Sequence, residues 1–252
     1  MLFPYFEQTA AHDQYNFSVP SSNSDWRQPI TGAGTAWKTN SQNLQIVKRE
    51  YKPLVCPSAA GKGQAGIGGA TSRSYPTIDA IRHNYFFSTG VFTDYNWSWT
   101  YYTSDIRQGA FGNNDAASFA DIQDGTSNSI ALGEGVGGLY KTSRHYGPWG
   151  PSGVHTSVHG RVVSWRSSIP LDIRSNTGEG QRNWHINSAY NNNPRDQTYA
   201  WVFNSLHPAG AQFALCDGSV QFLQDTMSYL TLCQMAYIHD GQVVGTVVPG
   251  TR

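Results

Sequence analysis

The chain has 252 residues, a length that suffices for one large domain or two small ones. Its 17 basic and 17 acidic residues balance, so the sequence carries no electrostatic signature for binding nucleic acid or anionic lipid. Charged residues form only 13% of the chain, while Gly (26), Tyr (14), Pro (12) and Trp (8) are plentiful, which favours short strands, turns and long ordered loops over helices. No apolar run approaches the roughly 20 residues of a membrane-spanning helix.

The N-terminal third contains few signals for regular structure. We expect a short helix around residues 7–14, an ordered loop over 18–43, and a strand or a helix end at 44–48. Two prolines within residues 51–58 favour extended backbone there. The glycine-rich segment 61–69 lacks the Gly-Lys-Ser/Thr ending of a phosphate-binding loop, so it predicts flexibility and no nucleotide site.

Strand signals begin in the middle of the chain. Strand candidates lie at 83–90, 130–132 and 161–165, and an Asp124-Gly125 turn precedes the second of them. Residues 135–200 are otherwise rich in loops, and loops this long in an ordered domain are usually functional or lie against a partner.

The clearest structural signal is a β-hairpin near the C-terminus. Apolar residues alternate on both sides of an Asp-Gly pair, in the order Phe213, Leu215, Asp217-Gly218, Val220 and Phe222. Asp-Gly suits a tight hairpin turn, because Gly adopts positive φ freely and Asp tolerates it better than most residues. A short helix over 225–237 and a final strand over 242–248 are expected to follow.

No internal repeat and no clear linker interrupts the chain. The sequence therefore predicts one α+β domain, mostly antiparallel β, over residues 1–252. Cys56, Cys216 and Cys233 form neither a zinc knuckle nor a disulfide scaffold. A bridge between Cys216 and Cys233 requires an oxidising compartment, and buried thiols are the favoured interpretation.

Three aspartates near turns are candidate metal ligands: Asp121, Asp124 and Asp217. Carboxylates and nearby backbone carbonyls are the oxygen ligands that calcium prefers. The calcium-loop pattern itself is absent, so turn and cap chemistry is the favoured interpretation and a bound calcium is the alternative.

Signals for an enzyme are weak. His145, His155 and His159 lie close together, but the glycines and prolines before His155 argue against a helix that would present them to one zinc ion. The Gly-x-Ser-x-Gly elbow of serine hydrolases is absent. We therefore predict no enzymatic activity, with a metal-dependent enzyme using His or Asp ligands as an alternative.

Aromatic residues supply a second functional hypothesis. Aromatic side chains form 13% of the chain, and four tryptophans stand in loop-rich sequence: Trp97, Trp99, Trp149 and Trp184. Exposed rings of this kind stack on sugar faces, while buried ones pack in a core. A carbohydrate-binding surface module is therefore an alternative function, with a polysaccharide as the partner.

Four sequence blocks follow one another in an order typical of one family. They are Leu2–Gln8 (LFPYFEQ), Val55–Ser58 (VCPS), Asp121–Asn128 with Glu134, and Ser205–Phe222, in which nine residues separate His207 from Asp217-Gly218. In these blocks the chain resembles the pilin-like proteins of planctomycetes and related bacteria that carry domain of unknown function 1559. Asn84-Tyr85 matches a weaker motif between them, and the resemblance covers nearly the whole chain.

The resemblance implies a globular pilin-like head on a membrane-inserted N-terminal helix, exported by a type II secretion or type IV pilus-like machine. That helix has no counterpart in residues 1–252, and we expect membrane contact only through it. The implied role is non-enzymatic, in surface filament assembly, secretion or adhesion. The expected location is extracellular or at the cell surface, and the expected partners are other pilin-like subunits or the secretion machinery.

The resemblance also implies structural roles for the motif residues, namely Cys56, Pro57, Asp121, Asp124, Gly125, Asn128, Glu134, His207, Asp217 and Gly218. We expect the imidazole of His207 to hold loop 204–211 against the sheet. By analogy with secretion pseudopilins, whose heads can bind calcium, the three aspartates are where a metal is expected. Cys216 departs from the family, which usually has a small or apolar residue there.

Overall fold

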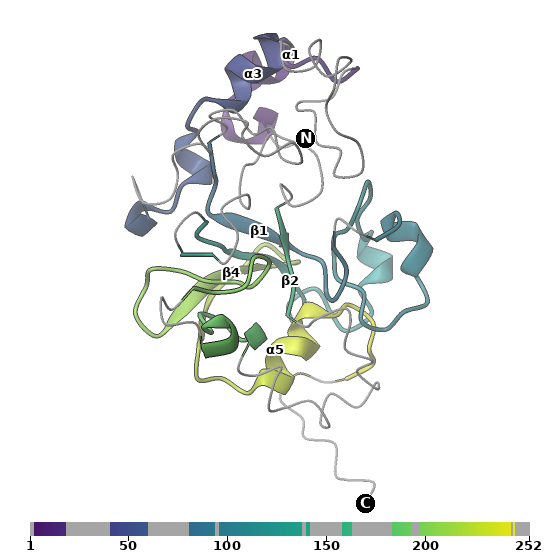
Figure 1. Cartoon of the computed structure of the whole chain (residues 1–252). Coiled ribbons are helices and arrows are strands. Elements are labelled where there is room, and N and C mark those ends of the chain that lie inside the picture. The colour runs from purple at the N-terminus through teal and green to yellow at the C-terminus, as the bar shows by residue number, and fades with distance from the viewer. Residues whose placement is uncertain are drawn as a thin grey trace, which may run out of the picture. The chain divides into compact units, whose positions relative to one another are not determined.

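The computed structural model describes residues 3–18, 41–59, 81–93, 96–137, 140–141, 158–162, 183–192, 197–242 and 244 (Figure 1). Contacts divide the chain into two compact units, residues 1–85 with 136–158 and residues 86–135 with 159–252. The single domain expected over residues 1–252 stays a prediction. Within the described ranges, no helix is long and apolar enough to cross a bilayer.

The first unit consists of short helices around a small aromatic core. Its elements are a 3₁₀ turn at Phe3–Phe6, helix α1 (Thr9–Gln14), helix α3 (Ser41–Val47), and 3₁₀ turns at Lys52–Leu54 and Pro57–Ala59. The core contains Phe3, Ala11, Ile46 and Tyr51, and the ring centroids of Phe3 and Tyr51 lie 5.1 Å apart. These apolar residues are far apart in sequence, so their burial holds the helices together.

The structure confirms part of the expectation for this unit. The helix expected around residues 7–14 is α1, and at 44–48 the chain forms the end of α3 and no strand. Extended backbone is wrong at both prolines, because Pro53 and Pro57 lie in 3₁₀ turns, where the fixed φ of proline also fits. Most of segment 18–43 and all of segment 61–69 lie outside the described residues.

The second unit is built on a five-stranded sheet with the order β3-β1-β2-β4-β5. The strands are β1 (Tyr85–Ser88), β2 (Ile130–Glu134), β3 (His159–Gly160), β4 (Gly210–Leu215) and β5 (Val220–Gln224). Strand β4 pairs antiparallel with β2 and β5, and β1 pairs parallel with β3. A mostly antiparallel sheet with few helices confirms the α+β class.

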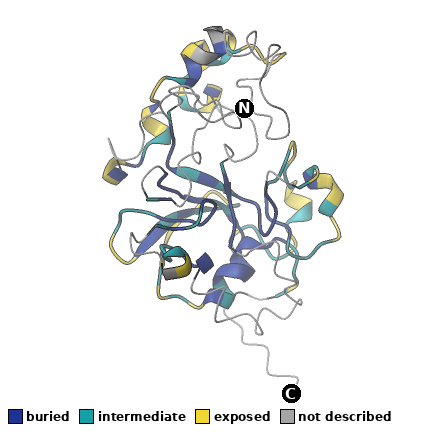
Figure 2. Ribbon diagram, viewed as in Figure 1, coloured by how far each residue is buried: buried dark blue, intermediate teal, exposed yellow. Residues whose placement is uncertain are grey.

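Strands β4 and β5 form the hairpin that the sequence predicts. Side chains alternate along β4, with Ala211, Phe213 and Leu215 buried, while Val220 and Phe222 of β5 are exposed. Figure 2 shows the strands of the sheet largely in the colour of buried residues, while exposed residues appear mainly on the connections around it. The hairpin therefore has one face in the core and one face in solvent.

The hairpin turn differs from the expectation at Asp217. Gly218 N donates to Leu215 O (3.0 Å) and Leu215 N donates to Ser219 O (2.8 Å), which closes a three-residue loop. Only Gly218 has positive φ (86°), whereas Asp217 does not. Asp217 contributes through its carboxylate instead, because its Oδ1 accepts from Ser219 N (2.8 Å).

Helix α5 (Tyr229–Ala236) confirms the helix expected at 225–237, although it starts four residues later, after the N-cap Ser228. Buried residues of α5 include Leu232 and Cys233, and the helix packs against β2. The strand expected at 161–165 is wrong at its start, because β3 ends at Gly160. Residues 163–165 and most of the strand expected at 242–248 lie outside the described residues, while Gln242 and Val244 are not in a strand.

Candidate functional site

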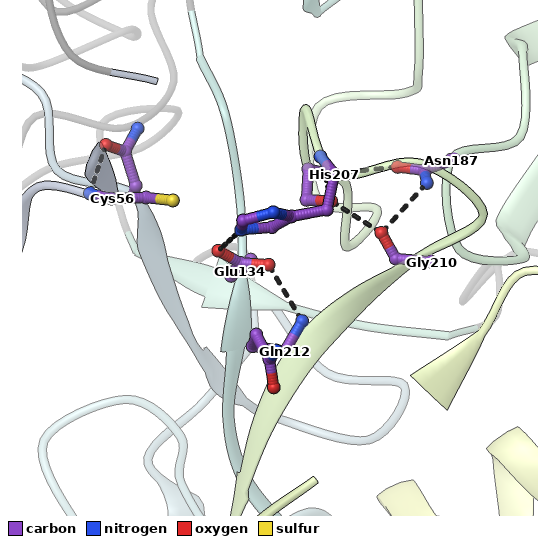
Figure 3. A network of polar contacts seen from close by, with 8 residues as sticks. Cys56, Glu134, Asn187, His207, Gly210 and Gln212 are labelled. Atoms are coloured by element: carbon purple, nitrogen blue, oxygen red, sulfur yellow. Dashed lines mark hydrogen bonds and ion pairs between the residues drawn. The ribbon is translucent and has the colours of Figure 1, made fainter. Parts of the chain in front are cut away.

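Glu134, the last residue of β2, is the centre of a polar network in the second unit (Figure 3). Its side chain is only 2% exposed. One carboxylate oxygen lies 3.2 Å from His207 Nε2, and the other accepts from Gln212 N at 2.7 Å. In the tautomer that carries its proton on Nε2, His207 donates to this carboxylate oxygen.

The sequence around Glu134 explains how the carboxylate reaches this position. Gly133 precedes it, and a Cβ atom there would lie 2.5 Å from the rings of Phe203 and Phe213. The glycine therefore lets two aromatic rings pack directly on β2. The backbone of Glu134 is fixed as well, since its carbonyl accepts from Asn204 N at 3.0 Å.

Loop 204–211 carries His207 and is closed by its own hydrogen bonds. Ser205 Oγ donates to Gly210 O (2.5 Å) and accepts from His207 N (3.1 Å). Asn187 bridges the same two residues, because its Oδ1 accepts from Ser205 N (2.8 Å) and its Nδ2 donates to Gly210 O (3.3 Å). The contact between His207 and Glu134 then joins this closed loop to β2. The imidazole thus contacts a strand of the sheet, as we expect from the sequence.

A buried carboxylate that orients an imidazole is also two thirds of a catalytic triad. A triad also needs a nucleophile, and the hydroxyl of Ser205 in the same loop already donates to Gly210 O. Both oxygens of Glu134 are likewise used, one by a backbone N–H and one by His207. The contacts therefore suit a network that fixes a loop and two strands.

Asp124 joins the turn before β2 to the segment after α5. Its carboxylate accepts from Asp240 N (2.7 Å) and Gly241 N (2.9 Å), and its own N donates to Ile238 O (3.1 Å). Asn128 closes the turn from inside, with its Nδ2 donating to Asp124 O (3.0 Å). Burial, followed by repulsion from Asp124, raises the pKa of Asp240 to about 6.

The other two predicted calcium ligands also bind local donors. Asp121 forms a capping box with Ser118, accepting from its N (2.8 Å) and Oγ (2.7 Å), and Asp217 accepts from Ser219 N. These hydrogen bonds lower the pKa of both carboxyl groups. Within either unit of the described chain, no three ligand atoms from His, Cys, Asp or Glu lie together. The calcium site stays a prediction.

The Cys-Pro-Ser block lies in the first unit. Cys56 N donates to the side-chain Oδ1 of Asn84 (2.9 Å), and Asn84 N donates to Leu54 O (2.9 Å), so Asn84 binds the Cys-Pro-Ser block and the residue just before it. Cys56, Cys216 and Cys233 are free thiols. Burial raises the pKa of Cys216 to about 11 and that of Cys233 to about 12, so neither is an activated nucleophile.

The tryptophans proposed to stack on sugars differ in exposure. Trp99 is buried with its Nε1 donating to Gly109 O (2.9 Å), and Trp184 is buried with Arg161 over its ring. Both are packing residues, which corrects the expectation that they present a ring to a ligand. Trp97 is 73% exposed and lies beside Tyr101, which is 71% exposed.

Two predicted groups lie partly or wholly beyond the described residues. Trp149, His145 and His155 fall outside them. His159 lies in β3, where burial lowers its pKa to about 4 and the charge of Arg161 adds to the shift. His159 is thus a buried histidine on β3, a terminal strand of the described sheet, and its lowered pKa keeps it neutral at pH 7.

Sequence reasoning missed several members of the network. Asn187 and Gln212 carry no motif, and Gln212 contributes only a backbone N–H, which no side-chain pattern reveals. The hydrogen bond from Asp240 N to Asp124 was equally hidden in the sequence. By contrast, Glu134 and His207 both stand in family blocks, and only their pairing required the structure.

Comparison with known families identifies the chain at the level of a family. A family model described as "Protein of unknown function (DUF1559)" matches residues 1–228, and the chain belongs to this family. The match includes Glu134, His207 and the Asp217-Gly218 turn. No curated protein and no solved structure matches the chain.

Proposed function

We propose that this chain is a non-enzymatic, exported head domain of the pilin or pseudopilin type. It acts at the cell surface in filament assembly, secretion or adhesion. Its partners are other pilin-like subunits or the secretion machinery, and an apolar helix upstream of residue 1 anchors it in the membrane. The proposal rests on membership in the DUF1559 family and on the resemblance of the four sequence blocks to pilin-like proteins.

One observation supports the non-enzymatic part most directly: the polar side chains of the family blocks bind backbone groups. Glu134 accepts from Gln212 N, Asp124 from Asp240 N and Gly241 N, and Asp217 from Ser219 N. A catalytic carboxylate needs to face substrate or a nucleophile. These carboxylates instead close turns and join strands, which suits a scaffold that displays loops.

The export part is tested with the natural gene, including whatever lies upstream of residue 1, in the source organism. Cells are fractionated, surface structures are sheared off, and the protein is detected with an antibody against this domain. We expect the protein in the envelope or sheared fraction, with a processed N-terminus upstream of Met1 by mass spectrometry. A matched chain that begins at Met1 should stay with a cytoplasmic marker. Retention of the natural product in the cytoplasm contradicts the proposal.

A second function, carbohydrate binding, is favoured by one specific observation. The rings of Trp97 and Tyr101 are both more than two thirds exposed, with centroids 6.3 Å apart, and Tyr102 lies 5.2 Å from Tyr101. Neighbouring exposed rings are suited to stacking on the apolar faces of sugars. The ligand class would then be a polysaccharide that offers two or more adjacent sugar rings.

A glycan array with the purified chain tests this second function. Binding to a polysaccharide should fall when Trp97→Ala or Tyr101→Ala removes a ring. Phe17→Ala is the matched control, because Phe17 is 56% exposed and belongs to the other unit. No binding to any glycan, or equal loss in the control, removes this function.

A further inference from the structure

Strand β5 is the terminal strand of the described sheet, next to β4 alone. Two of its apolar side chains face solvent, since Val220 is 66% and Phe222 is 42% exposed. A sheet edge with exposed apolar side chains is a template for pairing with another strand.

The ladder between β4 and β5 fixes the direction of every backbone group. At the turn, Leu215 N donates to Ser219 O (2.8 Å), and at the far end Asp225 N donates to Ala209 O (3.0 Å). These two pairs are therefore hydrogen-bonded pairs of the antiparallel ladder. Such pairs alternate with pairs whose N–H and C=O groups point away from each other.

It follows that Gln221 and Leu223 direct their backbone groups towards β4. The backbone groups of Val220, Phe222 and Gln224 point to the open edge. Among the described residues, those of Val220 and Phe222 have no hydrogen-bond partner. The open edge thus offers the N–H and C=O groups of Val220 and of Phe222, together with the N–H group of Gln224.

Nothing in β5 protects this edge. Natural edges are commonly blunted by lysines, prolines, bulges or inward charges. The sequence of β5 is Val-Gln-Phe-Leu-Gln, with no charge and no proline, and its register with β4 runs without a bulge. The chain as a whole has no net charge, so two copies do not repel one another.

We propose that β5 pairs antiparallel with β5 of a second copy of this chain, with Phe222 on the twofold axis. In this register Phe222 lies opposite Phe222 of the second copy, and Val220 lies opposite Gln224. Phe222 then exchanges both hydrogen bonds with its counterpart, and Gln224 N–H meets Val220 O. Val220 N–H meets Gln224 O, which also accepts from Met227 N within its own chain. The two exposed phenylalanine rings become cross-strand neighbours. The nearest charge, Asp225, lies opposite Ser219 and faces no like charge.

This register is self-complementary, which is the condition for an isologous dimer. An extended peptide from another protein would find the same hydrogen-bond groups, but nothing in β5 selects its side chains. The second copy supplies both the backbone groups and the matching apolar residues. The inference does not depend on the pilin-like proposal, because it concerns the 252-residue chain alone.

Sedimentation equilibrium of the purified chain over a wide concentration range tests the proposal. We expect a dimer that dissociates on dilution. Phe222→Lys places two lysines opposite each other, and Val220→Lys adds a charge at a residue that is 66% exposed and tolerant of substitution. Each should weaken the dimer at least about tenfold, because like or unpaired charges oppose burial. Phe222→Pro removes an outward N–H without touching the β4 ladder and should also weaken it.

The matched control is Gln221→Lys, which adds the same charge to the same strand. Gln221 is exposed, its backbone groups face β4, and its side chain lies on the opposite face from Phe222. This variant should dimerise like the original chain. Circular dichroism confirms that each variant is folded. A chain that is monomeric up to about 1 mM overturns the proposal, as does a Val220→Lys variant that dimerises unchanged.

Discussion

Replacing Glu134 by alanine is the sharpest test of the polar network. The substitution removes a side chain that is 2% exposed and two hydrogen bonds at once. Gln212 N then lacks the acceptor that lies 2.7 Å away, and His207 loses its contact with β2. The change leaves the backbone of both strands in place.

The expected cost follows from these contacts. An unsatisfied buried donor costs about 1–3 kcal/mol, and a hydrogen bond to a charged group contributes about 1.5–3 kcal/mol. With some relaxation and water entry, Glu134→Ala should lower the free energy of unfolding by about 3 kcal/mol. His207→Ala should cost about 1 kcal/mol, because its side chain is 30% exposed and Gln212 N still satisfies one carboxylate oxygen.

Urea unfolding at pH 7, followed by tryptophan fluorescence, measures both values through the midpoint and slope of the transition. The matched control is Gln212→Ala, which changes the side chain but keeps the N–H that Glu134 accepts. It should stay within about 0.5 kcal/mol of the original chain. A double-mutant cycle between Glu134 and His207 should give a coupling of about 1 kcal/mol.

One contrary result is a cost for Glu134→Ala that is no greater than the cost for Gln212→Ala. Another is a His207→Ala variant that keeps its stability but loses a surface function of the chain. The first result would show that the network does not hold the loop. The second would return His207 to the role of a functional group.

Three further outcomes follow from single residues. Asp240→Asn should raise the free energy of unfolding at pH 7 by about 1 kcal/mol, because the folded state raises the pKa of Asp240 to about 6 and so disfavours its ionised form. The stability advantage of the Asn variant should shrink as the pH falls from 6 to about 4, because Asp240 of the original chain is then protonated in the folded state. A difference in stability that stays constant with pH contradicts this prediction. Arg161→Met should lower the free energy of unfolding by about 2 kcal/mol, because the guanidinium lies 4.5 Å from the ring centroid of Trp184 and 4.2 Å from that of Trp201. Thermal unfolding measures this loss, and an unchanged midpoint contradicts it. Gly218→Ala should lower the free energy of unfolding by about 1 kcal/mol, measured in urea. The loss comes from backbone strain alone, because φ is 86° and no atom lies within 4 Å of the added Cβ. A larger loss would indicate a steric clash.

Local patterns in the sequence predict local structure well in this chain. The alternation around Asp217-Gly218 places the hairpin, and the near-helical spacing after it places α5. The turn type was harder, because Asp217 satisfies Ser219 N with its side chain instead of adopting positive φ. A side-chain hydrogen bond and a positive-φ backbone compete at this position, and residue type alone does not resolve which one forms.

Contacts between segments that are distant in sequence could not be predicted from the sequence. Glu134 and His207 are 73 residues apart, and each is informative only as part of its block. Asn187 adds two hydrogen bonds to loop 204–211 but comes from a loop-rich segment without a pattern. Burial is similarly invisible: Trp97 and Trp99 are two residues apart, yet one is exposed and the other is in the core.

Two carboxylates of the family blocks, those of Glu134 and Asp124, accept hydrogen bonds from distant backbone N–H groups. Glu134 joins β2 to β4 and to loop 204–211, and Asp124 joins the turn before β2 to the segment after α5. Each ties together parts of the chain that are distant in sequence, and charged acceptors form stronger hydrogen bonds to backbone N–H groups than neutral ones. Burying such groups is costly unless they are satisfied, so they specify one arrangement of the loops. In the second unit, a small sheet with long connections is held in one arrangement by these buried and turn carboxylates.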